Sequence, residues 1–147
     1  MLFKEKMVID GIDANDQNEL FSKVAERLQE LDVVQSSYLE ELKKRESVFP
    51  TGLQTKTIGV AIPHVDPVNI KTDGIMVVRP KRPVTFSQMG DPSSKVEAQI
   101  VFFICSTGGD QQLTTLRQLM DLFSNGEFLK KISVSEDLTN ELLTWKG

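Results

Sequence analysis

The segment Ala98–Ile104, which reads Ala-Gln-Ile-Val-Phe-Phe-Ile, limits the possible folds of this chain more than any other segment. From Ile100 to Ile104 every residue is apolar, so an extended strand here would present apolar side chains on both faces. Such a strand is stable only inside a sheet that is covered on both sides. We therefore expect this run to be a central strand.

The rest of the chain supplies the elements that would pair with this strand and cover it. Two starts are typical of a helix capping box, Asp16 with Glu19 and Ser37 with Glu40. Apolar periodicity predicts helices over residues 17–31, 37–44, 113–123, 128–132 and 135–145, and further strands over residues 58–62, 74–78 and 84–86. Helices on either side of a strand-rich middle predict an α/β fold with some α+β character: three α/β/α layers around a mixed central sheet.

Length and composition indicate a soluble single domain. The 147 residues are 39% apolar and 26% charged, and the net charge of −4 argues against nucleic-acid binding. One cysteine excludes an internal disulfide. The longest apolar run, Ile100–Cys105, is too short to cross a bilayer, and the first residues lack the apolar core of a signal peptide. We expect a cytoplasmic protein.

The only histidine, His64, follows the short apolar strand within the segment Gly59–Asp66. Pro63 and Pro67 restrict the backbone around it, so the imidazole is expected to be held rigidly with its tip exposed. A structural, hydrogen-bonded histidine is the ordinary alternative. A lone histidine without nearby cysteines offers too few ligands for a metal, and no nucleophile motif supports a Ser-His-Asp triad. We expect neither a metal nor a cofactor.

A neutral imidazole is a good nucleophile towards phosphorus, and a phosphorylated histidine needs neighbours that stabilise an anion. Arg45, at the end of the second predicted helix, is one such neighbour; the alternative is a solvated cation near a helix end. The segment Gly108–Gln112, which opens the third predicted helix, is another, because a helix start presents free N–H groups.

Two segments resemble the enzyme IIA component of the sugar phosphotransferase system, fructose–mannitol class. They are Arg45–Leu53, which reads Arg-Glu-Ser-Val-Phe-Pro-Thr-Gly-Leu, and Gly59–Asp66, which reads Gly-Val-Ala-Ile-Pro-His-Val-Asp. The form Phe-Pro-Thr-Gly-Leu is most similar to the galactitol-type subgroup. The resemblance covers nearly the whole chain and implies that residues 1–147 form a single enzyme IIA type 2 domain.

The resemblance also implies a function. His64 would accept phosphate from the histidine-containing phosphocarrier protein, with Nε2 as the family precedent. It would then pass the phosphate to a cysteine of the enzyme IIB component, which phosphorylates the sugar entering through the IIC component. The chain would be a phosphotransferase with a phosphohistidine intermediate, serving a sugar or sugar alcohol such as galactitol. Its protein partners would dock over a mostly apolar surface around His64.

This chain departs from the family pattern at one position. Many members have a second histidine followed by leucine at the start of the helix after the central strand, where this chain has Gln112 and Leu113. We predict that the Gln112 amide donates a hydrogen bond to the phosphate or orients His64; an exposed helix-start glutamine is an equally weighted alternative. The resemblance favours Arg45 as a phosphate ligand. Thr51 either donates its hydroxyl or shapes the turn before Gly52.

Other residues are given lesser roles. Asp66 could orient the imidazole but would repel phosphate, so it ranks below Arg45 and Gln112. Cys105 is predicted to be a buried small hydrophobe rather than a redox or phosphocysteine site. The basic segment 79–83 is predicted to be a solvated loop or guarded strand edge, with docking to an acidic partner as the minor alternative.

Two other functions stay open. The domain could be a phosphorylation-sensitive regulatory module of the same fold, although these 147 residues contain no DNA-binding segment. It could instead be a small-molecule binding module in which His64 is only a hydrogen-bonding group.

Overall fold

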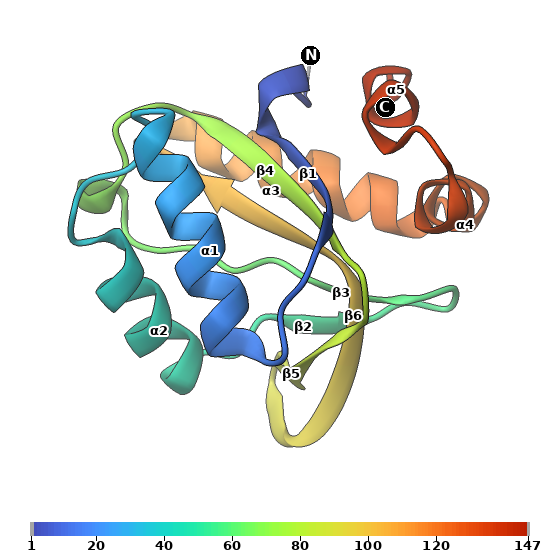
Figure 1. The fold of residues 1–147 in the computed structure, drawn as a ribbon, viewed down its shortest axis with the longest axis horizontal. Helices are drawn as coiled ribbons and strands as arrows, with labels where there is room; N and C mark the ends of the chain where they lie inside the picture. Colours follow the sequence, from blue (N-terminus) through green and yellow to red (C-terminus); the bar gives the residue numbers. More distant parts are fainter. Residues whose placement is uncertain (1, 147) are drawn as a thin grey trace.

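The longest strand, β6 (Asp91–Cys105), lies inside the sheet between β4 (Gly74–Pro80) and β3 (Gly59–Ala61). The computed structural model describes residues 2–146 (Figure 1). The strand order is β1-β4-β6-β3-β2-β5, and β5 also pairs with β6. The prediction of a central strand is confirmed, although β6 begins before Ala98.

The sheet is mixed, as predicted. The pairs β1–β4, β3–β6 and β2–β5 are parallel, whereas β2–β3, β4–β6 and β5–β6 are antiparallel. The other strands are β1 (Val8–Ile12), β2 (Gly52–Gln54) and β5 (Val84–Gln88). The helices are α1 (Gln17–Glu30), α2 (Tyr38–Val48), α3 (Asp110–Ser124), α4 (Gly126–Val134) and α5 (Leu138–Leu143), with 3-10 turns at η1 (Glu5–Met7) and η2 (Pro67–Asn69).

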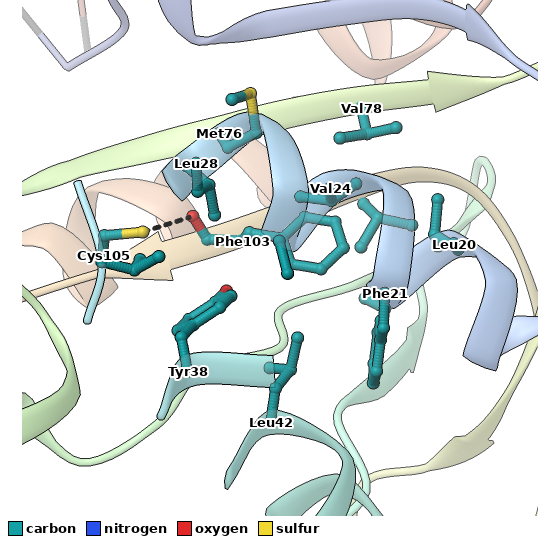
Figure 2. Packing of buried hydrophobic residues seen from close by; sticks show 14 of the residues in the cluster. Leu20, Phe21, Val24, Leu28, Tyr38, Leu42, Met76, Val78, Phe103 and Cys105 are labelled. Carbon is teal, nitrogen blue, oxygen red and sulfur yellow. Dashed lines mark hydrogen bonds between the residues drawn. The ribbon is translucent and has the colours of Figure 1, made fainter. Parts of the chain in front are cut away.

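Side chains of the central strands divide the core into two halves. In β6, Phe103 belongs to the cluster formed with α1 and α2, whereas Phe102 belongs to the cluster formed with α3, α4 and α5. Figure 2 shows the first cluster, in which Phe21 of α1 and Tyr38 of α2 lie near Phe103. Alternating residues of one strand point to opposite faces, so the all-apolar strand fills both halves. The predicted three-layer arrangement is confirmed.

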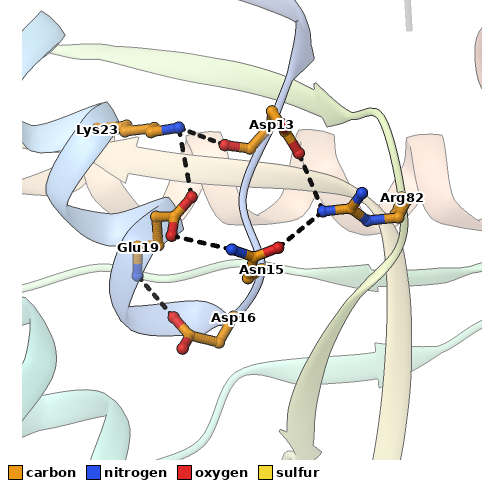
Figure 3. Close-up of polar contacts among 6 residues, drawn as sticks. All are labelled: Asp13, Asn15, Asp16, Glu19, Lys23 and Arg82. Carbon is orange, nitrogen blue, oxygen red and sulfur yellow. Dashed lines mark hydrogen bonds and ion pairs between the residues drawn. The ribbon is translucent and has the colours of Figure 1, made fainter.

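The start of α1 follows the predicted capping pattern (Figure 3). The Asp16 carboxylate accepts a hydrogen bond from the Glu19 N–H at 2.9 Å. Arg82, from the turn between β4 and β5, donates to Asp13 at 2.9 Å and to Asn15 at 3.0 Å. These bonds fix the loop between β1 and α1 against the sheet.

The start of α2 differs from its prediction. The Ser37 hydroxyl makes no cap to its helix; it donates to the Asn69 side-chain oxygen at 2.6 Å and so joins α2 to η2. The helix also continues to Val48 instead of ending near Lys44.

The prediction of a solvated loop or guarded strand edge at residues 79–83 is wrong for Arg79. This residue lies in β4, between β1 and β6, with a side chain only 16% exposed. Its guanidinium makes two bonds to the Asp10 carboxylate, at 2.8 and 2.7 Å. It also donates to the carbonyls of Ile132 and Ser135, at 2.8 and 2.6 Å. A bidentate carboxylate and two part-buried carbonyl acceptors explain why this cation leaves the solvent.

None of the helices formed within residues 2–146 has the length and apolar character needed to cross a membrane.

Candidate functional site

His64 lies where the chain leaves β3, beside the end of β6. It forms an isolated parallel bridge with Ile104, and the Ile104 N–H donates to the Pro63 carbonyl at 3.0 Å. Pro63 is buried, and the His64 residue is half-buried. The backbone at His64 is therefore held against the central strand, and the residue as a whole is partly exposed to solvent.

The imidazole is bonded through one ring nitrogen. Nδ1 of His64 lies 2.8 Å from the carbonyl oxygen of Ile62. A carbonyl can only accept, so Nδ1 carries the proton and Nε2 keeps its lone pair in the neutral ring. Nε2 is thus the ring nitrogen whose lone pair is free in this tautomer.

Arg45 reaches the His64 segment through an ion pair. It lies in the last turn of α2, and its Nη1 is 2.9 Å from Oδ1 of Asp66, two residues after His64. The guanidinium also stacks over the Phe49 ring, 5.5 Å from its centroid. A shallow pocket of about 190 Å³ is lined by these three side chains together with Glu41, Lys44, Val48 and Val65. The structure therefore brings Arg45 and Asp66 together.

Thr51 is engaged within the protein. It is 3% exposed, and its backbone N–H and its hydroxyl both donate to the Glu46 carboxylate, at 2.7 and 2.8 Å. The hydroxyl proton is therefore used in a contact with α2. This geometry agrees with the turn-shaping role, because Gly52 follows at once and a Cβ there would lie 2.6 Å from the Ser87 carbonyl oxygen.

Glu46 has no predicted role, yet it is the least expected buried group at this site. The residue is 6% exposed, and burial raises the pKa of its carboxyl to about 7, against the lowering effect of the two bonds from Thr51. The signal that could have identified it is its position four residues after buried Leu42, which extends the inward face of α2.

The turn between β6 and α3 packs beside the segment that follows His64. A Cβ on Gly108 would lie 3.6 Å from the Pro67 ring, and the Gly108 N–H donates to the Ser106 hydroxyl at 3.1 Å. Gly109 is the N-cap of α3 with φ of +77°, and no side chain caps the helix. The start of α3 therefore keeps first-turn N–H groups free of a side-chain cap.

Gln112 lies in that first turn and is half-buried. Within residues 2–146 its side chain makes no hydrogen bond, and none connects it to His64 or Arg45. The structure places it on the helix that follows the His64 bridge partner, but its predicted contact with phosphate or imidazole stays a prediction.

Large apolar side chains are exposed on the segments around His64. Val48 and Phe49 at the end of α2 are each 62% exposed, Val68 in η2 is 82% exposed, and Leu113 in α3 is 55% exposed. Val48 and Phe49 end the helix that contains Arg45, Val68 lies in the turn that follows His64, and Leu113 lies in the first turn of α3. These positions provide apolar surface of the kind that protein partners contact.

Cys105 ends β6 as a buried residue, and the prediction of a small hydrophobe is confirmed. Burial, as the main cause, and the nearby Asp73 carboxylate, as the second, raise the pKa of its thiol to about 12. The thiolate needed for nucleophilic chemistry is therefore scarce at neutral pH.

Residues 1–143 match the family described as phosphoenolpyruvate-dependent sugar phosphotransferase system, EIIA 2. The chain is 28% identical over 138 residues to the PTS system galactitol-specific EIIA component of Escherichia coli (strain K12), a match that covers 93% of this chain and 91% of that relative.

Two solved structures share the fold. The crystal structure of IIA mannitol from Escherichia coli has a TM-score of 0.76 and 17% identity, and covers 97% of each chain. The complex of enzyme IIAMTL and phosphorylated enzyme IIBMTL from Escherichia coli matches with a TM-score of 0.77 and 16% identity, over 96% of this chain and 94% of the other. Because the family match extends over nearly all of the sequence, this chain belongs to the EIIA 2 family of the phosphoenolpyruvate-dependent sugar phosphotransferase system.

Proposed function

We propose that this protein is a cytoplasmic phosphocarrier, formed by a single domain over residues 1–147, in which His64 carries the phosphate. His64 accepts a phosphoryl group from the histidine-containing phosphocarrier protein and passes it to a cysteine of enzyme IIB. The observation that carries this proposal is the bond from Nδ1 of His64 to the Ile62 carbonyl, because it fixes the ring and leaves Nε2 unprotonated on a half-exposed residue.

The chemical step is a transfer between two imidazoles. The Nε2 lone pair of His64 forms a bond to phosphorus while the nitrogen–phosphorus bond of the donor breaks, and the donor imidazole keeps the released electron pair. The His64 ring gains positive charge, since Nδ1 keeps its proton. The Ile62 carbonyl oxygen, 2.8 Å away, stabilises that charge.

Arg45 is proposed to bind the phosphoryl oxygens. Its ion pair with Asp66 aims the guanidinium at the His64 segment and offsets the repulsion that a free Asp66 carboxylate would exert on phosphate. The uncapped start of α3 supplies N–H groups as a second anion-binding element, and the Gln112 amide donates to the phosphate or orients the ring. Thr51 acts indirectly, by shaping the segment beside His64.

The exposed apolar residues around His64 are proposed to contact the donor and the IIB acceptor in turn, and a modest interface suffices for such transient docking. A relative that is named as galactitol-specific supports galactitol as the first sugar to test with the matching IIB and IIC components.

The test is incubation of the protein with phosphoenolpyruvate and the general phosphotransferase proteins, which include the histidine-containing phosphocarrier protein. We expect acid-labile phosphate on the wild type and none on H64A. Added IIB of the galactitol system should remove the label faster than IIB of the mannitol system. R45A and Q112A should slow labelling by about tenfold, which equals about 1.4 kcal/mol, with an unchanged melting temperature.

Two results would reject the proposal: a wild type that gains no phosphate, or H64A that is labelled as well as the wild type. The first result would favour a small-molecule binding module. Labelling of His64 without transfer to any IIB component would favour a regulatory module. An unchanged rate in Q112A would assign Gln112 to the surface alone.

A further inference from the structure

A continuous series of hydrogen bonds connects a buried carboxylate to the imidazole of His64. The Glu46 carboxylate accepts the N–H and the hydroxyl of Thr51, at 2.7 and 2.8 Å. The Thr51 carbonyl accepts the Ile62 N–H at 3.2 Å. The Ile62 carbonyl, in turn, accepts Nδ1–H of His64 at 2.8 Å.

We propose that Glu46 and Thr51 are positioning residues for His64, which act through Ile62 to fix the orientation and the tautomer of its imidazole. The inference rests on the proposed role of His64 as phosphate carrier. It adds a function for two residues of α2 and the following loop that do not need to touch the phosphate.

The position of Thr51 in the sheet explains how the contact reaches His64. Gly52 pairs with Ala61 in the antiparallel ladder of β2 and β3, and the bond from the Ile62 N–H to the Thr51 carbonyl extends this ladder by one step. Beyond Ile62 the chain has Pro63, which has no N–H to donate. The ladder bond at Thr51 is thus the last restraint from the β2 side on the backbone that presents the Ile62 carbonyl to His64. On the β6 side, the Ile104 N–H holds the Pro63 carbonyl at 3.0 Å.

Glu46 is suited to hold Thr51 because each of its carboxylate oxygens accepts one hydrogen bond from Thr51, and because both residues are buried. Glu46 is 6% exposed, Thr51 is 3% exposed and Ile62 is 1% exposed. Water cannot readily replace these bonds, and loss of the acceptor would leave two Thr51 donors unpaired in a buried setting. The two bonds to Glu46 therefore hold Thr51 in a single position.

The tautomer of His64 distinguishes a positioning role of Glu46 and Thr51 from a role in stability alone. Nε2 is the nucleophile only while Nδ1 holds the proton, and the Ile62 carbonyl selects that form. If the Thr51 segment moves, the Ile62 carbonyl loses its alignment and the ring can protonate on Nε2. A fraction of the protein would then present the wrong nitrogen to the phosphoryl donor.

The test uses ¹⁵N-histidine labelling of the full chain without a histidine tag, since His64 is the only histidine and gives one set of ring signals. Imidazole ¹⁵N shifts at high pH report the tautomer, and quench-flow labelling from the phosphorylated donor gives kcat and KM. The variants are E46M, E46Q, T51V and T51S. The matched control is E40Q, an exposed acid on the same helix.

We expect E46M, which has no acceptor, to shift the ring towards the Nε2–H tautomer and to lower kcat by about tenfold with little change in KM. E46Q should keep the wild-type tautomer, because its amide oxygen can accept the Thr51 N–H while its NH₂ donates to the hydroxyl. T51V should shift the tautomer equilibrium in the same direction as E46M, but by a smaller amount. T51S should cause a still smaller shift, and E40Q should cause none.

The proposal is overturned if folded E46M and T51V keep the wild-type tautomer, even if both melt at a lower temperature, because that pattern is purely structural. If E46M does not fold, T51V against T51S decides the question. A wild type that accepts no phosphate would reject the proposed function, yet the tautomer comparison would still decide whether Glu46 and Thr51 position the ring.

Discussion

Arg45 and Glu46 are adjacent in α2 but serve different surroundings. The Arg45 side chain is 35% exposed and pairs with Asp66, whereas Glu46 is buried and bonds to Thr51. Sequence reasoning proposed roles for His64 and Arg45 because a lone imidazole and a cation have recognisable chemistry, and both lie in the segments that carry the family resemblance. It assigned no role to Glu46, because a carboxylate on the inner face of a helix contradicts the usual preference of acids for solvent.

The raised pKa of Glu46 predicts a pH-dependent stability at the scale of this residue. The pKa is about 7 in the folded protein against an ordinary 4.5, so the folded state binds more protons between these values. The stability that the neutral carboxyl contributes is complete below about pH 4.5 and is lost as pH rises through about 7. Between these two pH values, the contribution of Glu46 to the free energy of unfolding should fall by about 3 kcal/mol.

The measurement is urea unfolding of wild type and E46Q from pH 4.5 to 8. Because glutamine cannot ionise, the stability of wild type relative to E46Q should fall steadily over this interval and level off above pH 8. E40Q gives the baseline for removing an exposed acid. A wild-type-minus-E46Q difference that is constant with pH would show that Glu46 titrates normally in the folded protein.

Among the elements, those with complete apolar periodicity were predicted well and those with mixed composition were not. The predicted helix over residues 17–31 matches α1, and the strand over 74–78 lies within β4. The first strand, β1, was missed because Asp10 and Gly11 interrupt its short apolar run at the sheet edge. The polar first half of β6 was missed because its strand form comes from pairing with β5.

The last helix shows a different limit. The prediction began at Ser135, but the chain is extended there, and α5 starts after Asp137, whose carboxylate accepts the Asn140 N–H at 3.1 Å. Apolar spacing located this helix, but its first residue depends on which of two nearby polar residues, Ser135 or Asp137, acts as the N-cap. The same uncertainty affected Ser37, whose hydroxyl binds Asn69 across space, a contact that local sequence cannot reveal.

The cap of α1 gives a prediction at the scale of one element. D16A should lower the free energy of unfolding by about 1 kcal/mol, because the Glu19 N–H loses its acceptor. D16N keeps a side-chain oxygen at the same place and should retain most of the stability. Chemical denaturation of both variants checks this; equal losses in the two would indicate that charge at the helix start, and not the bond, is responsible.

In the whole molecule, Arg79 joins the first strand to α4 and the residue that follows it. One guanidinium binds Asp10 of β1 and the carbonyls of Ile132 and Ser135, which lie in and after α4. The sequence alone placed this cation in solvent, because its three acceptors are 53 to 69 residues away along the chain. Such long-range partners have no local signal.

R79A should lower the free energy of unfolding by about 2 kcal/mol or more, since two carbonyls and a carboxylate lose their donor. R79K should recover part of this loss, because an ammonium cannot reproduce the planar fork. Hydrogen exchange should show faster opening of α4 and α5 in R79A, with α1 little changed. Uniform acceleration over the whole chain would mean that Arg79 stabilises the fold globally and not as a local brace.

The single cysteine has a practical consequence for the study of partner docking. Cys105 is 2% exposed at the end of the central strand, and it is the only thiol in the sequence. A cysteine introduced at Val68, whose side chain is 82% exposed and four residues after His64, would therefore be the sole thiol open to maleimide reagents. A fluorophore or cross-linker could then be attached at a single chosen point while the native core sulfur stays in place.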